Sequence, residues 1–421
     1  MTATPQRPSV RSRLISILSW LHTAPGAPRL PTGRQARWRR VLPVALVGAV
    51  FAAIVVADGI GLPGKVDPTA PFVVGYHFGI HEALAARGVP IADELSQYGY
   101  DGQWFLGQAN DPLLFTDLAL TFDYPRYRSI RVLLPALGWL LAAGQPAATP
   151  WALLVVQILA VALGCAACGR LVSAYGRSRW WGLVFAVIPG VWVGVAYGTA
   201  EPLGVALAML GVSLMIDRRY GWAGLAFAGT GLTKETYIAF AVGAACYLAV
   251  DATLKGERWL RRAALLVVPG AVSLIGWWAY VEVSLPPDQN YGVFSRFAAP
   301  FVGWFELFGA MLAGDFKENY PFGWASEAVL ITSFVVLVVA LAVALWLRQS
   351  VLAYLAAGWG LFGLIIAGFL LERFLSTQRA LAPAIAATVV FLIAVGWRRR
   401  KEPVDQPPEL VAAGERAGAG R

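Results

Sequence analysis

The residues best suited to chemistry lie in one polar stretch of an otherwise apolar chain, residues 98–112, which read YGYDGQWFLGQANDP. Asp101 is the central acid of this stretch. A carboxylate beside an apolar surface loses hydration, so its pKa is expected to rise toward a value that suits a general base. Such a base could take the proton of a sugar or lipid hydroxyl as that oxygen attacks an anomeric carbon. We predict Asp101 as the catalytic residue, and a solvated loop acid is the alternative.

The side chains around Asp101 are of the kinds that bind carbohydrate. Amides can hydrogen-bond sugar hydroxyls, and aromatic rings can stack on the face of a sugar. Asp111, in contrast, is followed by Pro112 and is typical of a turn that ends a helix. The residues of this stretch predicted to bind substrate are Tyr100, Gln103, Trp104 and Gln108.

Cations that suit a phosphate group follow in residues 123–131, DYPRYRSIR. Arg128 and Arg131 are three positions apart and would share one face of a helix, and Arg126 begins the same turn. Arginine binds phosphate through bidentate, charge-assisted hydrogen bonds. We predict that these three residues bind a lipid phosphate, and anchoring to headgroups is an equal alternative.

Three charged residues, Glu201, Lys234 and Glu235, interrupt apolar runs. A charge at the centre of a bilayer costs roughly 2.5–3.5 kcal/mol on insertion scales, so such residues need a cavity or a partner. A Lys234–Glu201 pair, or Lys234 bound to a phosphate, would meet that need, and a purely structural ion pair stays open. Arg373 and Arg379 bracket the outer end of the last helix pair, where they could complete a phosphate clamp or extend toward the headgroups.

A metal site is weakly indicated. His77 and His81 have i, i+4 spacing, but no third ligand is evident, so no metal ligand is assigned, although a divalent cation as cofactor stays open. Cys165 and Cys168 lie inside an apolar run without His nearby, which favours packing over metal or redox chemistry.

The elements that must position these residues are membrane helices. The chain has 421 residues, of which 58% are hydrophobic and 14% charged, and a mean hydropathy of +0.60. Soluble domains carry roughly 25% charged residues, so the composition excludes a soluble protein and predicts an all-α, polytopic protein of the cell membrane. The net charge of +9 comes largely from arginine clusters that flank apolar runs. By the positive-inside rule both termini are cytoplasmic, and no nucleic-acid partner is expected.

The apolar runs predict about ten crossings. The run 222–250 is expected to form two shortened helices that meet at the outer side near Lys234, and the run 130–143 is expected not to cross fully. The domains predicted are a basic cytoplasmic tail (1–40), a transmembrane domain (41–397) with outer loops at 58–129 and 284–325, and a second cytoplasmic tail (398–421). The runs are 41–57, 130–143, 151–171, 181–197, 201–216, 222–250, 263–283, 328–347, 351–371 and 380–397.

Three motifs in this order resemble the GT-C-type membrane glycosyltransferases, nearest to the GPI/PIG-type mannosyltransferase branch. YDGQWFLGQANDP resembles their first outer loop, in which an acid follows an aromatic residue. The segment 189–201, which ends YGTAE, is similar to a second signature in which an aromatic residue precedes Thr-Glu. The segment LTKET lies where that branch has a basic residue after small residues. The likeness covers the first half to two-thirds of the chain. It departs from the pattern at Tyr100, where Trp is usual, and at Ala200, which separates Thr199 from Glu201.

This resemblance implies a GT-C-like helical bundle with an outer active site, a polyprenyl-phosphate-sugar donor and inversion at the anomeric carbon. It implies that Asp101 is the base, that Glu201 and Lys234 line the site, and that the sugar is a hexose such as mannose, transferred to a glycan or lipid acceptor. The alternative is a transporter or flippase for a lipid-linked glycan, a class with broken helices at mid-membrane. A non-enzymatic membrane protein is the third interpretation.

Overall fold

The computed structural model describes residues 37–91, 96–288, 299–314, 324–346, 350–365 and 374–395, together with 15, 16 and 19. Within these residues every named element is a helix, and one isolated bridge joins Gly75 and Ser96. The predicted all-α class is therefore confirmed for the described part of the chain. Four of the described helices are long and apolar enough to cross a membrane, or five if one bent pair is a single span. The expected number of about ten crossings stays a prediction.

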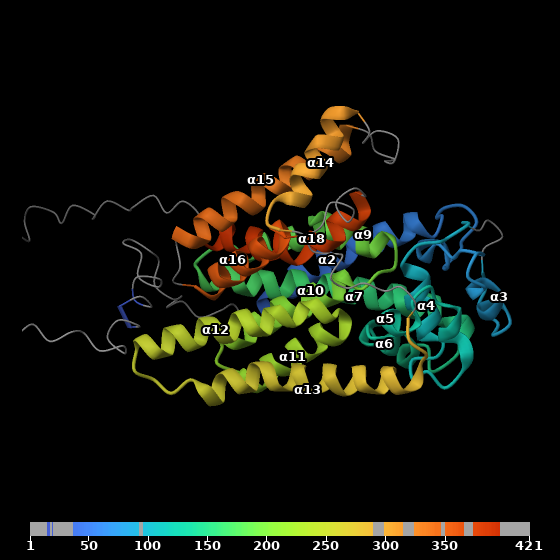
Figure 1. Cartoon of the computed structure of the whole chain (residues 1–421), viewed down its shortest axis with the longest axis horizontal. Helices are drawn as coiled ribbons and strands as arrows, with labels where there is room; N and C mark the ends of the chain where they lie inside the picture. Colours follow the sequence, from blue (N-terminus) through green and yellow to red (C-terminus); the bar gives the residue numbers. More distant parts are fainter. Residues whose placement is uncertain are drawn as a thin grey trace, which may run out of the picture.

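Most of the long helices lie side by side along the longest axis of the molecule, and α15 (Trp324–Trp346) is inclined to them (Figure 1). Their bounds follow the predicted apolar runs closely, and α10 begins and ends where the run 201–216 does. The largest differences are at α16, which ends at Leu364 instead of at 371, and at α18, which begins at Phe374 instead of at 380. These helices are α2 (Trp38–Gly59), α7 (Thr149–Ala174), α10 (Glu201–Ile216), α11 (Tyr220–Thr233), α12 (Ala239–Leu254), α13 (Leu260–Ser284), α15 (Trp324–Trp346), α16 (Val351–Leu364) and α18 (Phe374–Val395).

Short helices gather at one end of the bundle, at the right of Figure 1. They belong to the predicted first outer loop and to the run that follows it, so most of this loop is folded. The last of them, α6, has nine residues. At 1.5 Å per residue it is far shorter than a bilayer core of about 30 Å, which agrees with the expectation that the run 130–143 does not cross. The short helices are α3 (Ile80–Ala85), α4 (Gly102–Ala109), α5 (Pro125–Ser129) and α6 (Leu133–Leu141), with the 3-10 turns η1 (Ala70–Phe72) and η2 (Asp117–Thr121).

Two of the predicted spans are broken. The run 222–250 consists of α11, an extended Lys234 (φ −156°, ψ 121°), a 3-10 turn η5 (Glu235–Ile238) and α12, so the expected interruption is confirmed. The run 181–197, which we expected to be one span, bends by 57° between Arg179–Val187 and α9 (Pro189–Ala196). Pro189 has no N–H to continue the helix, and it forces the preceding Ile188 into an extended conformation.

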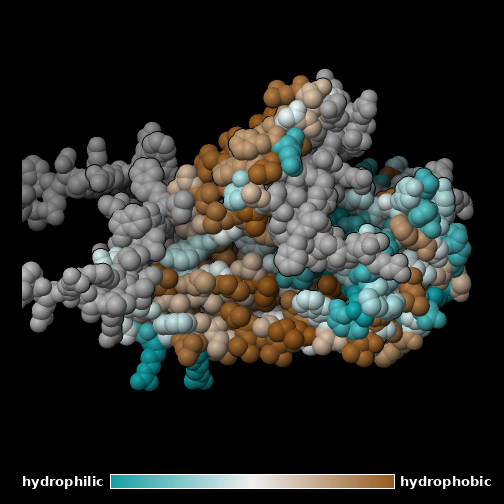
Figure 2. Space-filling view, viewed as in Figure 1, coloured by the Kyte–Doolittle hydropathy of each residue, from teal (hydrophilic) through white to brown (hydrophobic). Residues whose placement is uncertain are grey.

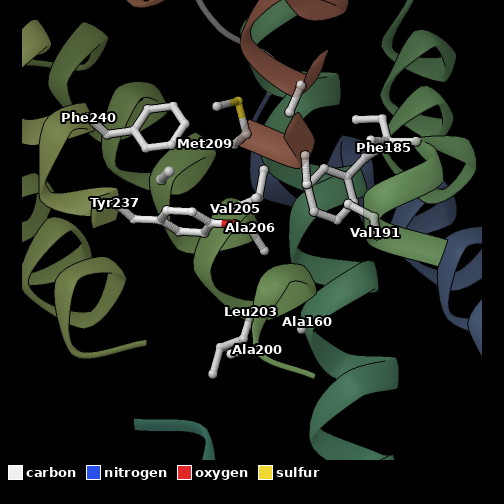
Figure 3. Packing of buried hydrophobic residues seen from close by; sticks show 14 of the residues in the cluster. Ala160, Phe185, Val191, Ala200, Leu203, Val205, Ala206, Met209, Tyr237 and Phe240 are labelled. Carbon is white, nitrogen blue, oxygen red and sulfur yellow. The ribbon is translucent and has the colours of Figure 1, made fainter. Parts of the chain in front are cut away.

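Helix α10 runs through the centre of the apolar core. Tyr237 and Phe240 pack against one side of it, and Phe185 and Val191 lie on the other side (Figure 3). Gly204 permits the first contact, because a Cβ at this position would lie 2.7 Å from the ring of Tyr237. Close packing through small residues is typical of helices that associate in membranes.

The outer surface of the bundle carries a broad apolar band. Side chains of α13 such as Val272, Ile275 and Val283 are exposed, and Figure 2 shows hydrophobic residues along this side of the molecule and hydrophilic ones over the end that holds the short helices. This distribution agrees with a membrane protein. Within the predicted second outer loop, α14 (Val302–Ala313) is a helix with Phe305 exposed and Trp304 buried.

Candidate functional site

Asp101 lies immediately before α4, at the end of the bundle where the short helices gather. Its neighbour Gly102 packs on the carbonyl oxygen of Tyr197, with which a Cβ would collide. Asp101 Oδ1 accepts a hydrogen bond from Arg128 Nη1 at 3.0 Å, and Oδ2 accepts one from Arg379 Nη1 at 2.8 Å. The Asp101 side chain remains 30% exposed, so solvent reaches the acid between its two cations.

The expectation that the pKa of Asp101 rises is wrong. Burial does act to raise this pKa, but Arg128 and Arg379 outweigh it and hold the pKa well below its usual range. The sequence argument considered only the lost hydration and not the two guanidinium groups. In the structure as it stands, Asp101 is therefore a stable anion and a poor proton acceptor.

Arg379 connects Asp101 to a second, fully enclosed acid. Its Nε lies 3.1 Å from Glu201 Oε2, and Lys234 Nζ lies 3.1 Å from Glu201 Oε1. Thr199 Oγ1 donates a further hydrogen bond of 2.6 Å to Glu201, whose side chain is 1% exposed. The predicted Lys234–Glu201 pair is thus confirmed. Glu201 is the first residue of α10, and Lys234 directly follows the last residue of α11.

The arginines of DYPRYRSIR separate into three environments. Arg128 also binds Asp123, through Nε and Nη2 at 2.8 Å each, an acid to which the sequence analysis gave no role. Arg131 forms a two-pronged pair with Glu235 at 3.0 Å. Asp123 precedes Arg128 by only five positions. An acid this close to an arginine in a short turn could have predicted the Asp123–Arg128 pair from the sequence.

Arg126 points to another part of the protein. Its Nε donates to the carbonyl oxygen of Leu285 at 2.8 Å, its Nη1 pairs with Glu282, and its backbone N–H donates to Asp288 at 3.0 Å. These partners lie at the end of α13 and just beyond it. Arg126 therefore ties the predicted first outer loop to α13, and its role in substrate binding stays a prediction.

The two glutamines expected to bind sugar contact backbone groups. Gln103 accepts from the backbone N–H of Gly75 and donates to the carbonyl oxygen of Tyr98, both at 2.9 Å. Gln108 donates to the carbonyl oxygen of Ser129 at 2.8 Å. Both side chains are buried and face backbone groups, because α4 is buried all round. Their hydrogen bonds in the structure are therefore to the backbone, and their role in substrate binding stays a prediction.

The aromatic residues near Asp101 differ in their roles. Trp104 is buried, with ring contacts to Phe78 and Phe122, so it packs within the loop and its face is not free for a sugar. The ring of Tyr100 lies 5.3 Å from the Arg379 guanidinium and 5.0 Å from the ring of Tyr197. Burial raises the pKa of Tyr100, so its hydroxyl keeps its proton beside Asp101 and Arg379.

Other predicted features have simple outcomes. Asp111 accepts hydrogen bonds from the backbone of Phe115 and Thr116, which confirms the turn. In the parts of the chain that the structure describes, no group of three or more His, Cys, Asp and Glu side chains could hold a metal ion. Cys165 is buried in α7 and faces Gly48 of α2. Arg373 lies outside the described residues.

The structure thus brings together the predicted residues Tyr100, Asp101, Arg128, Glu201, Lys234 and Arg379, and we call these six residues the acid–arginine cluster. Arg131 and Glu235 form a neighbouring pair. No family model matches the sequence, and no significant match is found among curated proteins. Fold and site together define an all-helical protein with several apolar helices and a partly exposed acid held by two arginines at one end.

Proposed function

We propose that the chain is a membrane glycosyltransferase that moves a hexose from a polyprenyl-phosphate-sugar donor to a glycan or lipid acceptor on the outer face of the cell membrane. The observation that carries this proposal is the position of Asp101 between Arg128 and Arg379, partly open to solvent. A carboxylate supplies a base, and two guanidinium groups supply a site for an anionic phosphate.

The proposed orientation has about ten crossings and both termini in the cytoplasm. The Arg170 guanidinium lies 4.1 Å from the ring of Trp38, so the start of α2 adjoins the end of α7. Arg39 and Arg40 therefore lie near the end of the bundle that also carries Arg218, beyond the last residue of α10. Glu201 begins α10, so its cluster lies at the opposite end. By the positive-inside rule the basic end is cytoplasmic and Asp101 is on the outer side.

The reaction begins with an exchange of partners. The donor phosphate binds Arg128 and Arg379, and this releases Asp101 from its two charge-assisted bonds. The pKa of Asp101 then rises toward that of an ordinary buried carboxyl, because burial still acts and the cations are shared with the phosphate. The donor thereby creates the base that its own reaction needs.

The transfer step is a single displacement. The acceptor hydroxyl oxygen forms a bond to the anomeric carbon on the face opposite the phosphate, and its proton passes to Asp101. The bond between the anomeric carbon and the phosphate oxygen breaks, and its electron pair leaves with the polyprenyl phosphate. Configuration at the anomeric carbon is inverted. Arg128 and Arg379 stabilise the charge that develops on the leaving phosphate.

The remaining cluster residues position Arg379. Glu201 holds its Nε, and Lys234 with Thr199 fixes Glu201 in turn. Removal of any of these would misplace a cation that contacts the donor. Tyr100, with its proton retained, can donate a hydrogen bond to a donor oxygen.

The test is Asp101→Asn in membranes supplied with a radiolabelled polyprenyl-phosphate hexose. Loss of a general base costs typically 10²–10⁴-fold in rate, and a loss in this range is expected. The matched control is Asp117→Asn, which makes the same change at an exposed loop acid. Full transfer activity in Asp101→Asn would remove the proposed base.

A transporter or flippase for a lipid-linked glycan is the second candidate. It is favoured by the two breaks, at Lys234 and before Pro189, since transporters bind substrates where helices are interrupted. In proteoliposomes a transporter would move the labelled lipid across the bilayer without a new covalent product. A glycosyltransferase gives a new glycosylated product and does not need that movement.

A further inference from the structure

A cavity of about 220 Å³ lies at the end of the bundle opposite the acid–arginine cluster. Helix α10 separates the two sites: Glu201 is its first residue, and the cavity begins at Met215 and Ile216 near its last turn. Sixteen residues at 1.5 Å each make a separation of roughly 24 Å. The cavity is therefore independent of the proposed transfer site. Its charged lining residues are Arg218, Asp251, Lys255, Glu257 and Arg262.

Arg218 occupies a backbone position that suits glycine. It has φ +61° and follows the C-terminal cap of α10. Its N–H donates to the carbonyl oxygen of Met215 and that of Arg219 donates to Leu214, both at 2.9 Å, the pattern of a helix end that glycine usually completes. Residues held in such conformations cluster where a side chain serves a function. Here the side chain of Arg218 lines the cavity.

The cavity contains more positive than negative side chains. Lys255 lies 2.7 Å from Asp251, and Arg262 lies 2.8 Å from Glu257, while Arg218 adds a third cation. Lys255, Glu257 and Arg262 are between 41% and 50% exposed, so these two pairs are weak and solvated. An entering anion can share their cations without first breaking a strong interaction.

Apolar residues line the cavity together with these charges, namely Met215, Leu248 and Val351. Trp222 and Leu260 are exposed and lie in the first turns of α11 and α13, at the same end of the bundle as the cavity. Tryptophan beside a basic helix end is typical of the membrane interface, at the depth of lipid headgroups. A ligand that fits both features has an anionic head and an apolar tail.

We propose that this cavity binds the phosphate headgroup of an anionic membrane lipid, with Arg218 as its principal cation. Lys255 and Arg262 bind the same phosphate, and the apolar lining residues Met215, Leu248 and Val351 contact the acyl chains. A soluble compound could also supply a phosphate group. The apolar residues beside the cations favour a lipid, because a lipid also has acyl chains to contact them.

The experiment titrates the purified full chain, in an uncharged detergent, with short-chain phosphatidylglycerol, short-chain phosphatidylcholine and inorganic phosphate. The thermal unfolding midpoint is the readout. Phosphatidylglycerol is expected to raise the midpoint, and the other two probes are expected to have little effect. An equal effect of phosphatidylcholine would overturn the charge argument, and an equal effect of inorganic phosphate would overturn the assignment to a lipid.

Variants of two adjacent arginines provide a matched comparison. Arg218→Gln is expected to weaken phosphatidylglycerol binding about five-fold, since one cation near a membrane surface has about that effect. Arg219→Gln makes the same charge change outside the cavity lining and is expected to bind as the parent protein does. Arg218→Gly removes the same cation while it relieves the backbone, so it should bind weakly and unfold no earlier without lipid. Equal binding by Arg218→Gln and Arg219→Gln would refute the site.

Discussion

Arg379 and Asp101 are 278 residues apart in the sequence, and Arg379 Nη1 donates a 2.8 Å hydrogen bond to Asp101 Oδ2. This bond joins the last described helix to the predicted first outer loop. The same guanidinium reaches Glu201 at the start of α10. The candidate site is therefore assembled from three distant parts of the chain and is complete only when α18 is packed against the bundle.

The pH dependence of transfer should respond to Arg379. Because its folded pKa is depressed, Asp101 contributes stability above its unfolded pKa of about 3.9, and this contribution is lost as the pH falls through the lower folded value. Arg379→Gln removes one of the two cations, so the pKa of Asp101 should rise. The acidic limb of kcat/KM, which reports the free enzyme, should move to higher pH. The measurement is kcat/KM from neutral pH down to about pH 3, where the parent protein should show no fall due to Asp101 and Arg379→Gln should show one as the pH approaches the ordinary Asp pKa of about 3.9.

The control for this profile is Arg87→Gln. Arg87 bonds Thr116 at 2.7 Å in the same outer loop and has no described contact with Asp101. Its acidic limb should coincide with that of the parent protein. An unmoved limb in Arg379→Gln would contradict the depressed pKa of Asp101.

Glu201→Gln should destabilise the protein strongly. The change leaves Lys234 and Arg379 near an uncharged amide, and breaking a buried ion pair costs about 3–5 kcal/mol. Lys234→Met should cost less, because Glu201 keeps Arg379 and Thr199 as partners. The measurement is the thermal unfolding midpoint of each variant in detergent, which ranks the variants by stability. Lys255→Met is the control, since the Lys255 side chain is 48% exposed and its pair with Asp251 should contribute little.

Gly102→Ala should disturb the cluster without changing any charged residue. The added Cβ collides with the carbonyl oxygen of Tyr197, and forced repacking costs about 1–3 kcal/mol. Transfer activity should fall together with the unfolding midpoint. Gly221→Ala is the comparison, because nothing lies within 4 Å of its Cβ in helix α11, and it should be stabilising. Similar unfolding midpoints for the two variants would contradict the expected cost of the collision at Gly102.

Gln103→Leu should affect stability and spare substrate affinity. It leaves the backbone groups of Gly75 and Tyr98 without their side-chain partner, at about 1–3 kcal/mol for an unsatisfied buried group. The unfolding midpoint should therefore drop while the KM for the donor is kept. A raised KM with unchanged stability would support the assignment of Gln103 to sugar binding.

Much of the helical architecture could be predicted because long apolar runs separated by short polar segments make helix bounds easy to recognise. The bounds of helix α10 agree with the apolar run 201–216 because Glu201 and Pro202 mark its start and the polar Asp217 marks its end. The Lys234–Glu201 pair could be predicted because a charge within an apolar run needs a partner.

The orientation of single side chains could not be predicted in the same way. Helix α4 is buried on every side, so periodicity gives no indication of whether Gln103 faces substrate or backbone. The pKa of Asp101 depends on Arg379, which is far away in sequence, and only the fold brings them together. The bend before Pro189 was missed because the run itself is continuously apolar.

The ends of two helices meet at the enclosed ion pair, and their polarity matches its charges. A helix carries roughly +0.5 elementary charge at its N-terminus and −0.5 at its C-terminus. Glu201 opens α10 and Lys234 terminates α11, so each side chain faces the favourable pole of its own helix. A ligand that arrives here therefore encounters an electric field set in advance by the backbone, and the scaffold need not reorganise to create it.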